Sequence, residues 1–157
     1  MGLTVLIGLP GSGKTTFCQS VGEGKSILLG DLLRQRNDSI IESCMRSGIL
    51  IPSDITISVL KDNIKCDGKE EKVLDGFPRN IEQAKILESE RIFVSKVIFI
   101  DTPQSICYSR LQKRGRFDDT EDCINKRFDS FYQDTLPLLN YYKLKAAPIE
   151  IINFSKD

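Results

Sequence analysis

A glycine-rich segment at positions 8–15 constrains the fold of this chain more than any other feature of its sequence. The segment reads GLPGSGKT and matches the pattern G-x-x-x-x-G-K-[ST] at every fixed position. The apolar run Leu3–Ile7 directly precedes it, and a stretch with helical character follows. Glycines let several backbone N–H groups converge on a phosphate, and the N-terminus of a helix adds positive potential. The pattern therefore predicts a strand, a phosphate-binding loop and a helix, in that order.

The remaining strands are predicted from short apolar runs rich in Val, Ile and Leu. These runs are continuous rather than alternating, which is typical of strands covered on both faces, as in a parallel sheet. Segments with helix signals separate them. This alternation predicts an α/β fold of the P-loop NTPase type, with a five-stranded parallel sheet and helices on both faces. The expected strands are Leu3–Ile7, Ser26–Leu29, Val73–Leu74 with its flanks, Val97–Ile100 and Ile149–Ile152.

Three of the expected helices have recognisable ends. Thr102-Pro103 puts a capping residue before a proline at the first helical position, and Gly115 ends that helix. Ser53 opens a second helix, in which apolar residues recur at helical spacing. Thr120 caps a third, long helix, which Pro137 should bend or break. The polar residues considered below follow the strands, at the edge where α/β sheets bind their ligands.

The composition excludes several kinds of chemistry. The chain contains no histidine, which rules out Ser-His-Asp and Cys-His catalysis and HExxH zinc sites. The five cysteines are widely spaced and form no CxxC pair, so zinc knuckles and thioredoxin-like redox chemistry do not fit. We expect these cysteines, Cys18, Cys44, Cys66, Cys107 and Cys123, to be reduced and mostly buried.

The length and charge of the chain limit the number of domains and the kinds of partner that we expect. A chain of 157 residues is long enough for one domain with a single core. Basic and acidic residues number 22 each, so the broad positive field of a duplex nucleic-acid binder is absent. No apolar run approaches the roughly 18 residues of a membrane span, and no secretory segment precedes the first strand. We expect a cytoplasmic protein that binds neither nucleic acid nor membrane.

Four residues that follow predicted strands have side chains suited to binding a phosphate and its magnesium ion. Lys14 can reach the β- and γ-phosphates of a nucleotide, and Thr15 can lie near a magnesium ion. Asp75, at the end of a buried strand, can hold the water shell of that ion. Arg79, released by a Gly-Phe-Pro turn, has a planar guanidinium that suits a phosphate. By themselves, Asp75 and Arg79 could equally be an ordinary strand-end aspartate and a surface arginine.

A set of four arginines follows later in the chain. Arg110 and Arg114 share one helix face, Arg116 comes at the helix end, and Arg127 lies on the next helix. Like charges four residues apart are destabilising unless something negative lies between them. A polyphosphate in transfer is one such partner. The alternative is that nearby acids neutralise the arginines at the surface; these are Asp118, Asp119 and Glu121.

Together these motifs resemble those of the nucleoside monophosphate kinase family, and adenylate kinase most closely. The similarity extends from Gly8 to about Tyr142, and the DGFPR segment beside a phosphate loop is its most specific element. The resemblance implies one nucleotide kinase domain over residues 1–157, a helical monophosphate-binding insertion at about 30–60 and a minimal lid at about 114–119. The matching segments are the loop at 8–15, GDLLR at 30–34, DGFPR at 75–79 with Gln83, and RFDD at 116–119.

The resemblance also implies roles for individual residues. On the donor side, the loop would hold ATP through Gly11, Ser12, Gly13, Lys14, Thr15 and Thr16, with Arg110 nearby. On the acceptor side, Arg34 and Arg79 would bind the monophosphate's phosphate and Gln83 its base, in a pocket that includes Asp31, Leu50, Ile51 and Gly76. Lys14, Arg79, Arg114, Arg116 and Arg127 would act on the transferring group, with Asp118 and Asp119 orienting arginines. Magnesium would be held by Thr15 and, through water, by Asp75.

Two of these residues bear on which base is accepted. Leu28 and Leu29 stand where the family usually has a small hydroxyl residue facing the acceptor adenine. Gln83 comes three residues after Asn80, so it is also a candidate partner in a helix capping box. Glutamine favours adenine here, since pyrimidine-specific relatives tend to carry asparagine.

The resulting hypothesis is a monomeric, magnesium-dependent phosphotransferase that converts ATP and AMP to two ADP. One alternative is a UMP/CMP kinase or a nucleotide kinase of broad specificity. An alternative of another class is a nucleotide-binding module without turnover. The arginine set argues against the passive module, because simple binding would not need so many cations.

Overall fold

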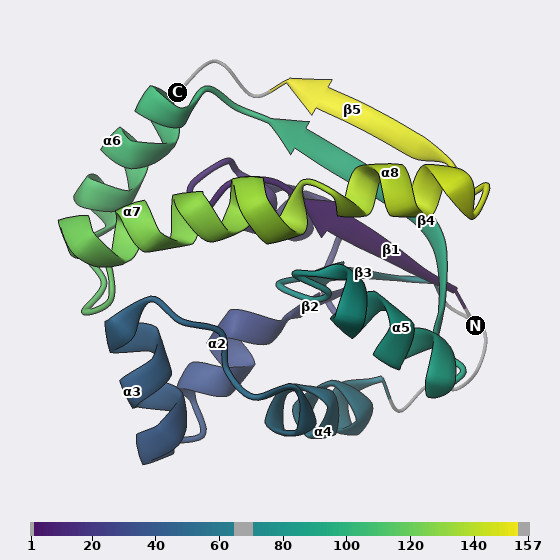
Figure 1. Cartoon of the computed structure of the whole chain (residues 1–157), viewed down its shortest axis with the longest axis horizontal. Coiled ribbons are helices and arrows are strands. Elements are labelled where there is room, and N and C mark those ends of the chain that lie inside the picture. Colours follow the sequence, from purple (N-terminus) through teal and green to yellow (C-terminus); the bar gives the residue numbers. More distant parts are fainter. Residues whose placement is uncertain (1, 65–70, 154–157) are drawn as a thin grey trace.

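A five-stranded parallel sheet forms the centre of the molecule in the computed structural model, which describes residues 2–64 and 71–153 (Figure 1). The strand order is β2-β3-β1-β4-β5, and every neighbouring pair is parallel. This confirms the α/β fold expected from the sequence. The strands are β1 (Gly2–Ile7), β2 (Ser26–Leu28), β3 (Lys72–Asp75), β4 (Phe93–Asp101) and β5 (Ile149–Asn153).

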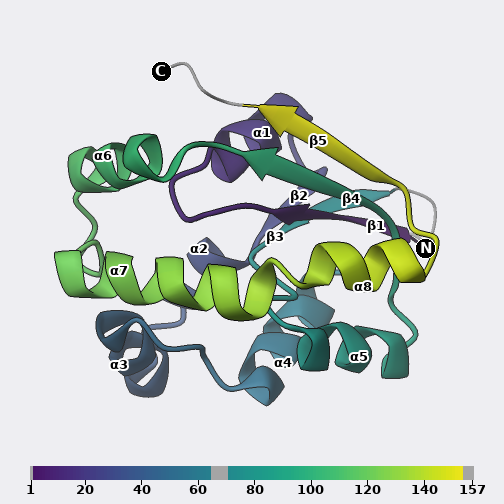
Figure 2. The ribbon, with the colours of Figure 1, turned by 45° about the horizontal axis from the view of Figure 1, so that its top comes forward.

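Helices cover both faces of this sheet (Figures 1 and 2). Val5 and Ile7 of β1 face a core shared with the later helices, whereas Leu6 packs with Cys18 of the first helix on the opposite face. Leu3 and Leu74 belong to a further core, formed with the helices after β2. The helices are α1 (Lys14–Ser20), α2 (Leu29–Arg34), α3 (Ser39–Ser47), α4 (Ser53–Asn63), α5 (Ile81–Ser89), α6 (Gln104–Arg114), α7 (Glu121–Ser130) and α8 (Leu138–Leu144).

The predicted helix ends are confirmed in three cases, one of which is the start of α4 at Ser53, and corrected in one. The Thr120 hydroxyl accepts a hydrogen bond from the Cys123 N–H and so caps α7, and Gly115 ends α6 with φ 63°. Thr102 does not cap α6, which begins at Gln104 after Pro103. The Thr102 hydroxyl instead donates to the Ser12 carbonyl oxygen at 2.8 Å. A buried carbonyl of the glycine-rich loop is thus its partner.

Between α7 and α8 the chain forms one wide helical turn, Phe131–Thr135, in which the Leu136 N–H donates to the Phe131 carbonyl five residues earlier. Pro137 explains this widening, because its ring lacks an N–H and crowds the carbonyl four residues before it. The expected disruption at Pro137 is therefore confirmed, as a π-helical turn rather than a sharp kink.

Four of the five cysteines lie in the described part of the chain, and all four are buried and free, as expected; they are Cys18, Cys44, Cys107 and Cys123. Cys66 lies outside the described residues. In residues 2–64 and 71–153, no helix combines the length and the apolar character needed to cross a membrane.

Candidate active site

A cavity of about 820 Å³ opens where the strands end, with Ile7 of β1, Leu28 of β2 and Asp75 of β3 in its lining. All site residues predicted from the sequence line this one cavity except Ser12 and Asp119, whose side chains are fully buried. Residues far apart in sequence therefore meet in one place. They are Gly11, Gly13, Lys14, Thr15, Thr16, Asp31, Arg34, Leu50, Ile51, Asp75, Gly76, Arg79, Gln83, Arg110, Arg114, Arg116 and Arg127.

The glycine-rich loop between β1 and α1 is packed too closely for side chains at two of its glycines. Gly11 has φ 79°, and a Cβ there would lie 2.6 Å from the Cys107 carbonyl oxygen. A Cβ on Gly8 would lie 2.6 Å from the Ser12 hydroxyl and 2.8 Å from a carbonyl oxygen at the end of β4. Only glycine allows this close approach, and the loop is further closed by a hydrogen bond from the Ser12 N–H to the Leu9 carbonyl oxygen at 3.0 Å.

Two cations of the site are held by carbonyl groups of this loop. The Lys14 ammonium donates to the carbonyl oxygens of Gly8 and Leu9 at 3.0 and 2.9 Å. Burial lowers the pKa of Lys14, and the nearby Asp75 carboxylate partly offsets this effect. Arg110 of α6 approaches the loop from the other side, with 3.4 Å from its guanidinium to the carbonyl oxygens of residues 11 and 12. The loop is therefore surrounded by positive charge.

The segment after β3 forms the opposite wall of the cavity. Asp75 ends the strand beside Leu6, and Gly76 follows with φ 103°. The Arg79 guanidinium donates to the Gly76 carbonyl at 3.1 Å, which folds the side chain back along its own turn. The backbone carbonyl of Arg79 accepts from the Thr135 hydroxyl at 2.6 Å. Sequence reasoning did not single out Thr135; the only signal near it is the disruption expected at Pro137.

Gln83 shows a variant of the capping arrangement that its spacing from Asn80 predicts. The Asn80 side chain accepts from the Gln83 N–H at 2.8 Å and caps α5. The Gln83 Oε1 accepts from the backbone N–H of Arg79 at 2.7 Å, rather than from that of Asn80. Gln83 is 3% exposed and lines the cavity. Its carboxamide oxygen is therefore used to hold the turn before α5.

Arg114 at the end of α6 and Arg127 of α7 converge on a buried carboxylate, that of Asp119. Arg114 binds it with two hydrogen bonds of 2.7 and 2.6 Å, and Arg127 with one of 2.8 Å. The backbone N–H of Arg116 adds a bond of 3.0 Å. Burial alone would raise the pKa of Asp119, but the hydrogen bonds from Arg114 and Arg127 outweigh it and lower the pKa to about 2. Asp119 therefore stays ionised and fixes the arginines at the cavity.

A second carboxylate links this loop to α2. Asp118, 3% exposed, lies 3.1 Å from Arg34 and 3.8 Å from Arg127. Asp31 lies 3.4 Å from Arg34 and 3.6 Å from Arg116. Acids near the arginines do partner them, as the surface alternative supposed. They do so around a cavity, however, and two of the acids are buried, so this is not a solvated surface network.

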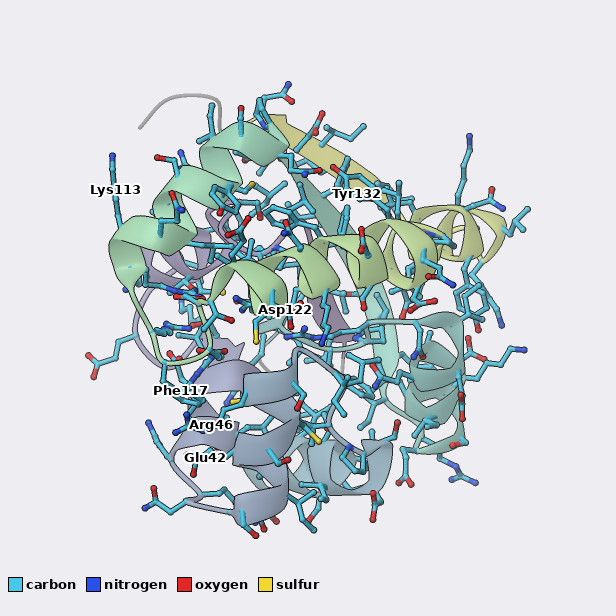
Figure 3. The ribbon with its side chains drawn as sticks, turned by 60° about the vertical axis from the view of Figure 1, so that its left-hand side comes forward. Glu42, Arg46, Lys113, Phe117, Asp122 and Tyr132 are labelled. Atoms are coloured by element: carbon cyan, nitrogen blue, oxygen red, sulfur yellow. The ribbon has the colours of Figure 1, made fainter. Side chains whose placement is uncertain are left out.

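The short loop 115–119 also contacts α3. The guanidinium of Arg46 lies over the Phe117 ring, 4.9 Å from its centre, and Arg46 pairs with Glu42 on the same helix (Figure 3). Figure 2 shows α3 below α7, and the Cys123 thiol donates to the Arg46 carbonyl oxygen. The cavity is therefore closed on this side by contacts between segments at residues 39–47 and 115–130.

Oxygen donors suited to magnesium lie on both sides of the loop. Asp75 forms no ion pair within the described residues, and Thr15 stands at the start of α1; both line the cavity. Carboxylate and hydroxyl oxygens are the ligands that this hard cation prefers. Residues 2–64 and 71–153 contain no group of three or more acidic or cysteine side chains that could hold a metal by themselves. A metal here would need nucleotide phosphates as further ligands.

Comparisons with known proteins agree with this geometry. The sequence profile of the adenylate kinase family matches residues 6–147. The chain is 37% identical to "Probable UMP-CMP kinase 1" of Arabidopsis thaliana, over 96% of this chain and 79% of the relative. It is 31% identical to "Uridylate kinase" of Saccharomyces cerevisiae, over 93% and 80%. It is 33% identical to "Adenylate kinase" of Mycolicibacterium vanbaalenii, over 94% and 90%. The chain belongs to the adenylate kinase family.

Proposed function

We propose that this protein transfers the γ-phosphoryl group of ATP to AMP, with magnesium bound to the nucleotide phosphates. Membership of the adenylate kinase family makes it a nucleoside monophosphate kinase. One observation carries the proposal: a single cavity is lined by the phosphate loop 8–15, by the pair Arg34 and Arg79, and by three further arginines, Arg114, Arg116 and Arg127. A site for one nucleotide would not need two separate phosphate-binding sets.

On the donor side, the loop supplies the contacts for ATP. The backbone N–H groups of Gly11, Ser12, Gly13, Thr15 and Thr16 and the ammonium of Lys14 bind the β- and γ-phosphates. Arg110, held at the loop carbonyls by two contacts of 3.4 Å, lies beside the same phosphates. Glycine at positions 8 and 11 makes this approach possible, because any Cβ there would collide with backbone or side-chain atoms.

On the acceptor side, Arg34 and Arg79 bind the phosphate of AMP with planar donor pairs. One oxygen of that phosphate attacks the γ-phosphorus of ATP, and the bond from the γ-phosphorus to the bridging oxygen of ADP breaks. The acceptor phosphate is already largely ionised at neutral pH, with a second pKa of about 6, so no general base is required. Arg114, Arg116 and Arg127 neutralise the charge on the transferring group.

Magnesium fits the residues at the loop. Thr15 and, through water, Asp75 would hold it, since both present oxygen atoms to the cavity. When bound, the ion would neutralise charge on the nucleotide phosphates. The chain itself places Asp75 near Lys14 and Thr15 at the start of α1.

The choice of AMP rests on Gln83 and the apolar wall beside it. The side chains of Leu28, Leu50 and Ile51 line the cavity, whereas Leu29 packs into the core. Gln83 lines the cavity with its Oε1 bonded to Arg79, so its Nε2 is the group that would donate to a ring nitrogen of adenine. A buried polar group that is left unpaired by the wrong base costs binding energy, which is how such a contact discriminates.

A second candidate acceptor is UMP or CMP. Three of the relatives with the highest identity are named UMP-CMP kinases, at 37, 35 and 34%. The geometry of Gln83 permits this choice as well, because its Nε2 donor would also match a carbonyl oxygen of a pyrimidine. Adenine remains the first proposal, since glutamine at this position is the adenine-type residue of the family resemblance.

A coupled assay with ATP, magnesium and each monophosphate in turn tests the proposal. AMP or dAMP should have the highest kcat/KM, and Gln83→Ala should reduce kcat/KM for AMP more than the value for CMP or UMP. A kcat/KM for CMP or UMP at least equal to that for AMP would overturn AMP and support the second candidate. Absence of turnover with every monophosphate would favour a passive nucleotide-binding module.

The wider proposal concerns the whole chain. The chain acts as one domain. The helices at about residues 30–60 bind the monophosphate, and residues at about 114–119 form a minimal lid. One chain supplies both nucleotide sites, so it works as a monomer; sedimentation at working concentration tests this. The four described cysteines are buried and free, which suits the reducing cytoplasm.

A further inference from the structure

The geometry points to Thr135 as a positioning residue that holds Arg79 in the acceptor half of the cavity. This inference rests on the proposed function, in which Arg79 binds the phosphate of the monophosphate. Thr135 lines the cavity, and its hydroxyl donates to the Arg79 carbonyl oxygen at 2.6 Å. No motif of the chain includes Thr135, and its role follows from this contact.

The backbone of Arg79 is held on both sides by side chains. Its N–H donates to the Gln83 Oε1 at 2.7 Å, and its carbonyl accepts from Thr135. The Arg79 guanidinium is directed by the Gly76 carbonyl at 3.1 Å. The partners Gly76 and Gln83 lie within four residues of Arg79 and set the shape of the turn, whereas Thr135 is 56 residues away. Thr135 therefore sets where the turn lies relative to the α7–α8 layer.

The wide turn before Pro137 is what presents Thr135 to Arg79. Phe131 opens this turn and is buried in the core with residues of α7 and α8. Tyr132 lies on the outside, 47% exposed (Figure 3). Asp134 and Thr135 line the cavity. An uninterrupted α-helix advances by about 100° per residue, so the extra residue of a π-helical turn changes which side chains face inward. Such turns often occur at functional sites.

The expected consequence of losing the hydroxyl is selective. A phosphate-binding guanidinium must be placed closely to contribute, and a shift of about 1 Å is costly. Without the Thr135 hydroxyl, the Arg79 turn keeps its local hydrogen bonds but loses this bond to the segment between α7 and α8. Within residues 2–64 and 71–153, the Thr135 hydroxyl bonds the Arg79 carbonyl and no atom of the phosphate loop. Monophosphate binding should therefore weaken while ATP binding stays the same.

Thr135→Val tests this, because valine keeps the branched shape and removes the donor. The KM for the preferred monophosphate should rise roughly three- to tenfold, the range expected for one lost hydrogen bond. The KM for ATP and the melting temperature should stay at their wild-type values. Thr135→Ser should restore the wild-type KM. Gln133 is exposed on the same turn. Gln133→Ala is therefore the matched control and should leave both KM values unchanged.

A double-mutant cycle with Arg79→Ala separates positioning from a structural role. In the Arg79→Ala background, adding Thr135→Val should cause no further rise in the monophosphate KM. The inference is overturned if Thr135→Val behaves like wild type, if both KM values rise equally, or if its effect persists without the Arg79 side chain. If the valine variant does not fold, Thr135→Ala is compared with Thr135→Ser by the same criteria. Failure of the proposed function looks different: wild-type protein would not turn over, or Arg79→Ala alone would leave the monophosphate KM unchanged.

Discussion

Lys14 donates its hydrogen bonds to carbonyl oxygens of its own loop, Gly8 and Leu9. Replacing it therefore removes no core packing, but it removes the one ammonium at the phosphate loop. We expect Lys14→Met to abolish phosphoryl transfer and to leave the melting temperature close to that of wild type. The exposed Lys143→Met on α8 is the matched control and should keep full activity. Near-normal turnover in Lys14→Met, measured in the coupled assay, would contradict the assignment of the donor site.

Two arginines of the cavity should differ in the step that they affect. Arg79 lies on the acceptor wall, where Gln83 and Thr135 hold its backbone. Arg116 lies on the short loop after α6 and reaches Asp31 at 3.6 Å. We expect Arg79→Ala mainly to raise the monophosphate KM. Arg116→Ala should mainly lower kcat, by on the order of 10³ if it stabilises the transferring group as an arginine finger does. Equal and small effects from both would mean that these arginines are ordinary surface charges.

Among the structural elements, the loop 115–119 is held to α6 and α7 by the buried carboxylate of Asp119. Asp119 is hydrogen-bonded to Arg114, Arg127 and the Arg116 backbone, and its pKa is lowered to about 2. A carboxyl group with such a lowered pKa contributes about 2 kcal/mol to the free energy of unfolding at neutral pH. We expect Asp119→Asn to lose about this amount at pH 7, measured by urea unfolding, and to lower kcat because its arginines are no longer fixed.

The pH dependence of that loss is a sharper test. The folded pKa of about 2 lies below the unfolded value of about 4, so the stabilisation is present above about pH 4 and is lost as the pH falls toward 2. The difference in unfolding free energy between wild type and Asp119→Asn should therefore shrink by about half at pH 3. Asp122→Asn is the control: this carboxylate is 77% exposed and pairs with Lys126 on the surface of α7. If the difference in unfolding free energy between wild type and Asp119→Asn is the same at pH 7 and pH 3, the ionised Asp119 carboxylate is not the cause of the stabilisation.

At the scale of the whole molecule, the cavity should hold two nucleotides at once. A molecule with two adenosines joined by five phosphates should then bind far more tightly than ATP or AMP, because one association makes both sets of contacts. At about 100 times its Kd it should raise the unfolding free energy by roughly 2.7 kcal/mol. Calorimetry measures the affinity and thermal unfolding measures the stabilisation.

Competition experiments with the same molecule identify the sites that it occupies. It should displace both ATP and AMP, since the loop 8–15 and the pair Arg34 and Arg79 line the same cavity. An affinity no higher than that for ATP, or displacement of ATP without displacement of AMP, would leave only one nucleotide site. The lid proposed at about 114–119 is short, so we also expect slow hydrolysis of ATP without an acceptor, since fewer residues exclude water.

The sequence alone determined the fold and most of the residues at the cavity. Continuous apolar runs predicted all five strands of the sheet. The central strand β1 is buried on both faces and needs such residues, and the edge strand β5 has the same pattern although Ile151 is exposed. The Thr120 cap and the Gly115 helix end were predicted because their hydrogen bonds and backbone angles involve neighbours within a few residues. The loop 8–15 was recognised for the same reason: its glycines and lysine act locally.

Only the tertiary structure decided which of these residues touch one another. Arg34 meets Asp118 across 84 residues of sequence, and Thr135 meets Arg79 across 56. Thr102 bonds the phosphate loop rather than capping its own helix. The packing of helices and strands determines these partners. The sequence around a hydroxyl or carboxylate is the same whichever distant group it binds, so it does not reveal the partner. The sequence therefore specified the chemistry present at the cavity, and packing specified its geometry.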